Sequence, residues 1–233
     1  MKQEFLASLL HISDPTLPIG AYTHSNGLET YIQNGIVNNK QTAQEFVENM
    51  MKYNLKYNDG AFVKLAYEAT QHSDLKEILK LDEECSALKA PKEIRQASQK
   101  LGLRLIKIFK RRVESEFVEE YERNIKQNIA YSNYAIVFGI YTSLLQIPLY
   151  EALFAFYYTS ASGIVTNAVK LVPLGQLDGQ DLMFDLYETI SQTAKETIEL
   201  DREYVGLCNT SFDIRCMQHE RLYSRLYLSL IHI

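Results

Sequence analysis

The prolines of this chain are few and far apart, and this constrains its fold more than any other sequence feature. Five prolines occur in 233 residues, and none lies within 19–90, 92–147 or 174–233. Because proline removes a backbone donor and stops helices, such long stretches without it favour helices. Apolar residues recur at helical spacing along most of the chain, with no long strand-like alternation. The sequence therefore predicts an all-α fold, a single domain of about ten helices over residues 1–233.

Helix caps and turn-forming residues indicate where the expected helices begin and end. Asn58, Asp59 and Gly60 predict a break, Ser73 an N-cap, and Gly35 a left-handed helix end. The expected helices are a short one ending before Asp14, then 23–34, two within 41–71, 73–85, 91–109, 113–130, a hairpin divided at Pro148, one from Asp178 or Asp181 to Tyr204, and 213–229.

One stretch of the chain is almost free of charge. Between Lys126 and Lys170 the only charged residue is Glu151. A membrane-spanning helix needs roughly 20 predominantly apolar residues, and Gly139, Pro148 and several Ser and Thr residues interrupt this stretch. We therefore expect a helical hairpin in the protein core and no membrane span.

The charge balance excludes a general nucleic-acid binder. The chain carries 24 Lys and Arg against 29 Asp and Glu, a formal net charge of −5. Nucleic-acid binding needs a concentrated basic surface, and only residues 110–112 form a local basic cluster. The three cysteines form no CxxC pair, and the N-terminus has no signal-peptide pattern. Both features favour a reducing, cytoplasmic location.

The motifs of common enzyme and metal sites are missing from the sequence. The five histidines are scattered, without an HxxxH or HxH pair that would place two metal ligands on one helix face. No phosphate-binding loop, dinucleotide fingerprint or nucleophile elbow occurs. We therefore expect no catalytic residues, no cofactor and no preformed metal site.

Three segments do carry unusual local chemistry. Residues 13–29 combine two prolines, two glycines and small polar residues at the entry to a helix. Residues 167–180 place Lys170 at the end of the apolar hairpin, and residues 217–229 bring Tyr and Arg together on a terminal helix. Each segment has two interpretations that stay open on these grounds: ordinary helix packing, or a surface for a partner.

Together these segments resemble the UreF family of urease accessory proteins. Residues 18–29 (PIGAYTHSNGLE) resemble the opening signature of that family, and residues 93–98 (EIRQAS), ahead of Leu101-Gly102, resemble its middle. Residues 170–176 (KLVPLGQ) resemble its late loop, and residues 223–227 (YSRLY) its C-terminal end. The four matches follow one another along nearly the whole chain, which makes them specific as a set.

The resemblance implies an all-helical scaffold that is not an enzyme and is usually a homodimer. Such a scaffold joins the accessory protein UreH, also called UreD, to the nickel-carrying GTPase UreG, regulates GTP hydrolysis, and so helps deliver nickel to apo-urease. By position in the matched motifs, the residues expected to engage UreG or gate hydrolysis are Tyr22, His24, Glu29, Lys170 and Arg225. The N-terminal segment and the last helix, with Arg221, Tyr223 and Tyr227, are expected to engage UreH.

A second hypothesis places a small-molecule site in the low-charge hairpin. Glu151 is an isolated carboxyl group in an apolar setting, and burial would raise its pKa. A ligand-sized cavity beside Glu151 would favour this hypothesis, and a two-fold interface would favour the scaffold.

Overall fold

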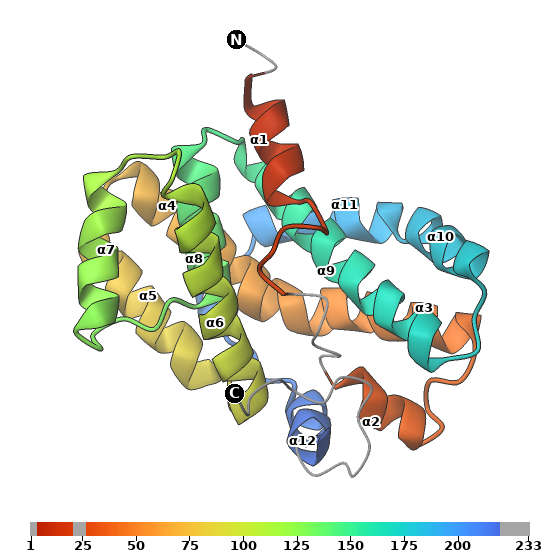
Figure 1. The fold of residues 1–233 in the computed structure, drawn as a ribbon. Helices are drawn as coiled ribbons and strands as arrows, with labels where there is room; N and C mark the ends of the chain where they lie inside the picture. Colours follow the sequence, from red (N-terminus) through yellow and green to blue (C-terminus); the bar gives the residue numbers. More distant parts are fainter. Residues whose placement is uncertain (1–3, 21–26, 220–233) are drawn as a thin grey trace.

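One long, continuous helical segment spans residues 40–71. It is seen in a computed structural model (Figure 1) that describes residues 4–20 and 27–219. The segment consists of α3 (Lys40–Met50), the π-helix η2 (Met51–Gly60) and α4 (Ala61–Gln71), which follow one another without interruption. The predicted break near residues 58–60 is therefore wrong, because Gly60 has helical dihedral angles, φ −63° and ψ −42°.

Contacts with distant parts of the chain explain why these turn-forming residues stay helical. The Asp59 carboxylate pairs with the Lys89 ammonium at 2.7 Å. A Cβ atom at position 60 would lie 1.9 Å from the Tyr157 hydroxyl, so glycine is needed for close packing and not for a turn. Tertiary packing thus overrides the local signal.

The low-charge hairpin forms the centre of the fold, as predicted. α8 (Tyr134–Leu144) packs against α4 and α6 (Lys92–Phe109), and its residues 135–142 are all buried. α9 (Leu149–Leu171) follows Pro148 and packs against both α10 and α11. Within the described residues, no helix combines the length and the apolar character needed to cross a membrane.

The remaining helices cover this centre. All regular secondary structure in the described part of the chain is helical, and the buried apolar residues form one core. The fold is therefore all-α, as the sequence predicts. The covering elements are α1 (Glu4–Ile12), α2 (Leu28–Gln33), α5 (Leu75–Leu88), α7 (Glu116–Lys126), α10 (Gln176–Asp185), α11 (Tyr187–Ile198), the short 3₁₀ helix η3 (Arg202–Tyr204) and α12 (Thr210–His219).

The helix predicted to reach Tyr204 is divided in the structure. It is interrupted at the fully buried Leu186, and α11 ends at Ile198. The Lys64 ammonium, from α4, donates hydrogen bonds to the carbonyl oxygens of Ile198 at 2.7 Å and Leu200 at 3.1 Å. A lysine that satisfies the last carbonyls ends a helix, and this one comes from a distant element.

Other helix ends differ by a few residues from the prediction. Asp74, not Ser73, caps α5, because its side chain accepts a hydrogen bond from the Glu77 backbone while Ser73 has a φ of 52°. The last helix begins at Thr210 instead of residue 213, and its predicted continuation past 219 lies outside the described residues. Gly35 has a φ of 69° just past α2, as predicted.

A buried carboxylate joins three elements of the core. Asp82 of α5 is fully buried. It accepts hydrogen bonds from the Tyr121 hydroxyl of α7 at 2.9 Å and from the backbone of Tyr131, Ser132 and Asn133 at 2.6–2.9 Å. Asp82 therefore fixes the loop that leads into α8.

Candidate functional site

Two of the eight predicted partner-binding residues lie in the described part of the chain. They are Glu29, in the first turn of α2, and Lys170, in the last turn of α9. The other six lie outside the described residues: Tyr22, His24, Arg221, Tyr223, Arg225 and Tyr227.

The signature segment at residues 18–29 is attached to the fold at both of its described ends. The Arg104 guanidinium of α6 donates a hydrogen bond to the Ile19 carbonyl at 2.7 Å, and Gly20 has a φ of 82° there. At the other end, Gly27 has a φ of 80°, and a Cβ atom on it would lie 2.8 Å from the Cys216 sulfur of α12. The two glycines therefore permit turns in close contact with α6 and α12.

An ion cluster continues this contact between α2 and α12. In the His219 cluster, formed by Glu29, Glu93 and His219, the imidazole lies between two carboxylates. Its Nδ1 is 2.9 Å from Glu93 Oε2, and its Nε2 is 3.7 Å from Glu29 Oε1. Glu29 is only 4% exposed. Because its carboxylate is buried next to His219, Glu29 helps to position α12.

The two carboxylates change the protonation of His219. Burial by itself disfavours the charged imidazole and would lower the pKa of His219. The hydrogen bonds and negative charges of Glu29 and Glu93 outweigh this, so the pKa of His219 is raised above its ordinary value. A charged His219 ties α12 to α2 and α6.

The sequence interpretation did not single out His219 or Glu93 as site residues. The sequence does contain a signal for both residues. Glu93 begins the middle family-like segment, and His219 lies in residues 217–229, which carry unusual local chemistry. Sequence spacing does not show that the two meet, because the contact depends on how α12 packs against α6. The structure thus brings two of the family-like regions, 18–29 and 93–98, together with the end of α12 at one junction.

Lys170 lies in a different setting. It is exposed in the last turn of α9 and precedes Val172, which is buried and ends the helix with an extended conformation. The Gly175 backbone then donates to the Asp178 carboxylate at 2.8 Å, where α10 begins. A cation in the last turn is favoured by the helix dipole, and its exposure also leaves it accessible to a partner.

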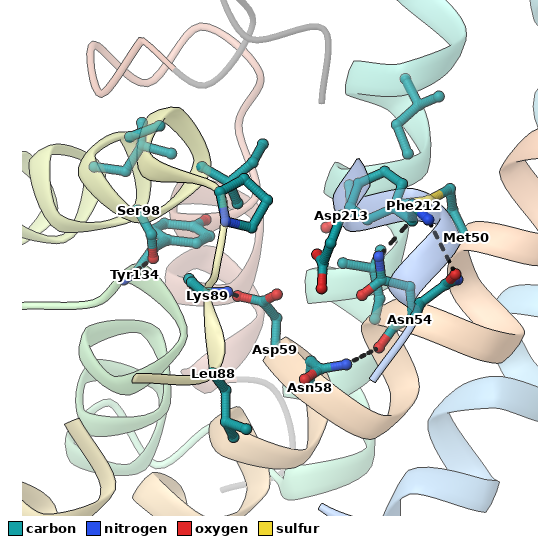
Figure 2. Close-up of a pocket in the computed structure, with 18 of the residues that line it drawn as sticks. Met50, Asn54, Asn58, Asp59, Leu88, Lys89, Ser98, Tyr134, Phe212 and Asp213 are labelled. Atoms are coloured by element: carbon teal, nitrogen blue, oxygen red, sulfur yellow. Dashed lines mark hydrogen bonds and ion pairs between the residues drawn. The ribbon is translucent and has the colours of Figure 1, made fainter. Parts of the chain in front are cut away.

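A cavity lies between η2, α6, α9 and the first turn of α12 (Figure 2). It has a volume of about 180 Å³, and the Asp59–Lys89 ion pair lies in its wall. Glu151 does not line it; it lies in the first turn of α9, before the segment 156–164 that does. The described cavity therefore does not support the hypothesis of a ligand site at Glu151.

These features define a class of protein: an all-helical molecule that presents exposed helix faces. In residues 4–20 and 27–219, no group of three His, Cys, Asp or Glu side chains could hold a metal ion. The comparisons with known proteins are more specific.

The chain belongs to the UreF family. The UreF family model matches residues 37–187. The urease accessory protein UreF of Actinobacillus pleuropneumoniae serotype 5b (strain L20) is 44% identical over 224 residues, which cover 96% of this chain and 99% of that protein. The urease accessory proteins UreF of Haemophilus influenzae (strain PittGG) and Lachnoclostridium phytofermentans are 42% and 33% identical, over 96% and 97% of this chain and 95% and 99% of their own lengths.

The family membership settles the broad role of the chain. It is a urease accessory protein with a role in urease maturation, and it is not an enzyme.

Proposed function

We propose that this chain is the scaffold of a nickel-insertion complex. It bridges UreH (UreD) and the GTPase UreG, works as a homodimer, and regulates GTP hydrolysis by UreG while nickel, the cargo, passes to apo-urease. The family assignment supports an accessory role, and the missing phosphate-binding loop is consistent with a partner that supplies the nucleotide chemistry.

The observation that carries this proposal is the junction at the His219 cluster. The opening signature, the middle segment and the terminal helix are far apart in sequence, yet Glu29, Glu93 and His219 meet. A change in how α12 docks therefore acts directly on α2 and α6. Such a junction suits a protein that passes the binding of one partner on to another.

The partner residues take different parts in this proposal. Lys170 is exposed and contacts UreG directly, together with Tyr22, His24 and Arg225, while Glu29 holds α12 in position. The residues of the terminal helix, Arg221, Tyr223 and Tyr227, engage UreH.

The N-terminal helix adds a second surface for UreH. α1 projects from the body of the molecule (Figure 1), and Leu6 and Leu10, one helical turn apart, are 47% and 65% exposed. Exposed leucines on one face of a helix favour docking against an apolar groove of a partner.

Co-purification on a sizing column tests the scaffold. Wild-type chain mixed with UreH and UreG should elute as one complex whose UreG content depends on GTP. Lys170→Ala and Arg225→Ala should lose UreG and keep UreH. Lys126→Ala is the matched control, because Lys126 is also an exposed lysine in the last turn of a helix, α7. A wild-type chain that elutes alone under every condition would refute the proposal.

The regulatory part of the proposal has its own readout. Phosphate release by UreG is measured with and without the UreH-bound chain, at UreG concentrations that saturate binding. A rate that stays the same when the complex forms would leave the scaffold intact and remove GTPase regulation from the proposal.

A further inference from the structure

The cavity between η2, α6, α9 and α12 has one wall that is mostly apolar and one that is polar. The apolar wall is formed by α6, α8 and α9, with Ile94, Tyr134 and Phe156 among its residues. The hydroxyls of Thr159 and Ser160, which also belong to this wall, donate back to the carbonyls of their own helix. This wall therefore offers a ligand mainly apolar surface.

The polar wall is formed by the π-helix and the first turn of α12. π-helical geometry is rare and frequent at functional sites, and here it carries Asn54 and Asp59 at the cavity. Asn54 is only 9% exposed, and the one hydrogen bond that its side chain makes within the described chain is a weak one, to the Met50 sulfur at 3.9 Å. A buried amide this poorly satisfied can still bind a ligand.

The charges of this wall do not balance. The Asp59 carboxylate is neutralised by Lys89 at 2.7 Å. The Asp213 carboxylate points into the cavity (Figure 2) and makes no hydrogen bond or ion pair with the described residues. Burial raises the pKa of Asp213, and the charge of Lys89 opposes this. Among the described residues, the wall thus has two carboxylates and one ammonium group, and Asp213 is the carboxylate outside the ion pair.

Gly163, in the middle of α9, gives an independent indication of a ligand. Glycine destabilises a helix interior, and three other helical glycines are explained by close contacts. A Cβ on Gly60, Gly102 or Gly139 would lie within 2.5 Å of a Tyr157, Ser132 or Val63 oxygen, respectively.

Gly163 lines the cavity, and a Cβ atom there would meet nothing within 4 Å. No contact inside the described chain requires glycine at this position. A ligand that lies close to the helix backbone would require glycine at position 163, because any side chain there would occupy its space.

We propose that this cavity binds a small organic cation, an amine with a compact apolar body. Its ammonium group pairs with Asp213 and hydrogen-bonds to Asn54, and its apolar body lies over Gly163 against Phe156 and Ile94. Aromatic walls favour cations as well as apolar groups. A cavity of about 150 Å³ holds a benzene ring, so the 180 Å³ here suit a ring with a short side chain.

Three probes that share a phenyl group test the charge preference on the full chain. They are 2-phenylethylamine, 2-phenylethanol and 3-phenylpropionate, compared at pH 7 by titration calorimetry and by saturation-transfer NMR. The amine should bind at least ten times more tightly than the alcohol, and the carboxylate should bind least. Equal affinities, or no binding of the amine, would overturn the proposal.

Variants locate the site. Gly163→Leu should abolish amine binding by filling the cavity, and Gly163→Ala should weaken it, because the added methyl group takes the space in which the ligand approaches the helix backbone. Asp213→Asn should reduce the amine affinity to that of the alcohol, and the exposed Asp201→Asn should leave it unchanged. Circular dichroism confirms that each variant is folded. Amine binding that persists in Gly163→Leu would place the ligand elsewhere and refute the assignment.

Discussion

Asp82 shows how a single buried carboxylate can organise loop and helix together. Its two oxygens accept bonds from α7 and from the backbone of residues 131–133, and the Asn133 side chain adds another at 2.8 Å. Hydrogen bonds to a charged group stabilise more than neutral ones. The nearby Tyr121 hydroxyl is kept protonated, since burial and the Asp82 charge raise the pKa of Tyr121 well above its usual range.

Removal of this carboxylate should destabilise the whole chain. Asp82→Ala leaves several buried donors without an acceptor, and each costs about 1–3 kcal/mol. We expect the free energy of unfolding to fall by at least about 3 kcal/mol in urea denaturation. Asp82→Asn should lose less, because one oxygen acceptor remains.

The neighbouring Glu83 provides the control for this prediction. It is exposed on the same helix, so Glu83→Ala should change the stability by less than about 0.5 kcal/mol. A similar loss in both variants would mean that helix α5, and not the Asp82 network, sets the effect.

At the scale of elements, α12 is the helix whose attachment depends most visibly on charge. His219 at its end is held by Glu93 of α6 and Glu29 of α2, and the Thr30 hydroxyl donates to the Arg215 carbonyl at 3.1 Å. The pKa of His219 is raised in the folded state. Because the folded pKa exceeds the unfolded one, His219 contributes its stability below the unfolded value, and this contribution is lost as the pH rises through the folded pKa.

The docking of α12 should therefore weaken on the alkaline side. The difference in melting temperature between wild type and His219→Gln should be largest near pH 6 and should shrink toward zero above the raised pKa of His219. His72→Gln serves as control, since His72 is exposed just past α4. A difference that stays constant from pH 6 to pH 9 would show that the imidazole acts by packing alone.

The elements also show which parts of the fold the sequence could predict. Proline-free stretches predict the helices and the low-charge stretch predicts the buried positions of α8 and α9, because both depend on local composition. The continuation of the helix through Gly60 and the helix end at Ile198 depend on Tyr157 and Lys64, which come from other elements. Local patterns contain no information on such contacts.

The same distinction applies to the site. The family-like segments indicate Glu29 and Lys170 as functional positions, and the structure places Lys170 on the surface and Glu29 in a buried ion cluster. Nothing near Glu29 in the sequence predicts its burial, since His219 lies at the other end of the chain. The sequence does not predict the cavity for a related reason, because Asn58 and Asp59 in its wall resemble a turn, whereas the structure places them in the π-helix.

At the scale of the whole molecule, exposed apolar side chains gather on one side of α9. Leu177 and Phe184 of α10 lie on one helix face and are 80% and 62% exposed, and Tyr187 of α11 continues the strip. The rings of Phe184 and Tyr187 are 5.7 Å apart, and Tyr158 of α9 lies 6.4 Å from Tyr187. Contiguous apolar side chains of this size favour a protein interface.

The proposed homodimer needs a surface that binds a second copy of the chain. We expect this surface to be the strip of Leu177, Phe184, Tyr187 and Tyr158. The double variant Phe184→Ser and Tyr187→Ser should shift the mass measured by light scattering from dimer to monomer, because aromatic anchors dominate such interfaces. Because Phe184 and Tyr187 are exposed, replacing them should change the free energy of unfolding only slightly. The matched control is Tyr53→Ser with Leu103→Ser, which removes exposed apolar groups from η2 and α6. If the control dissociates equally, or the wild type is a monomer, this strip is not a dimer interface and remains available to other accessory proteins.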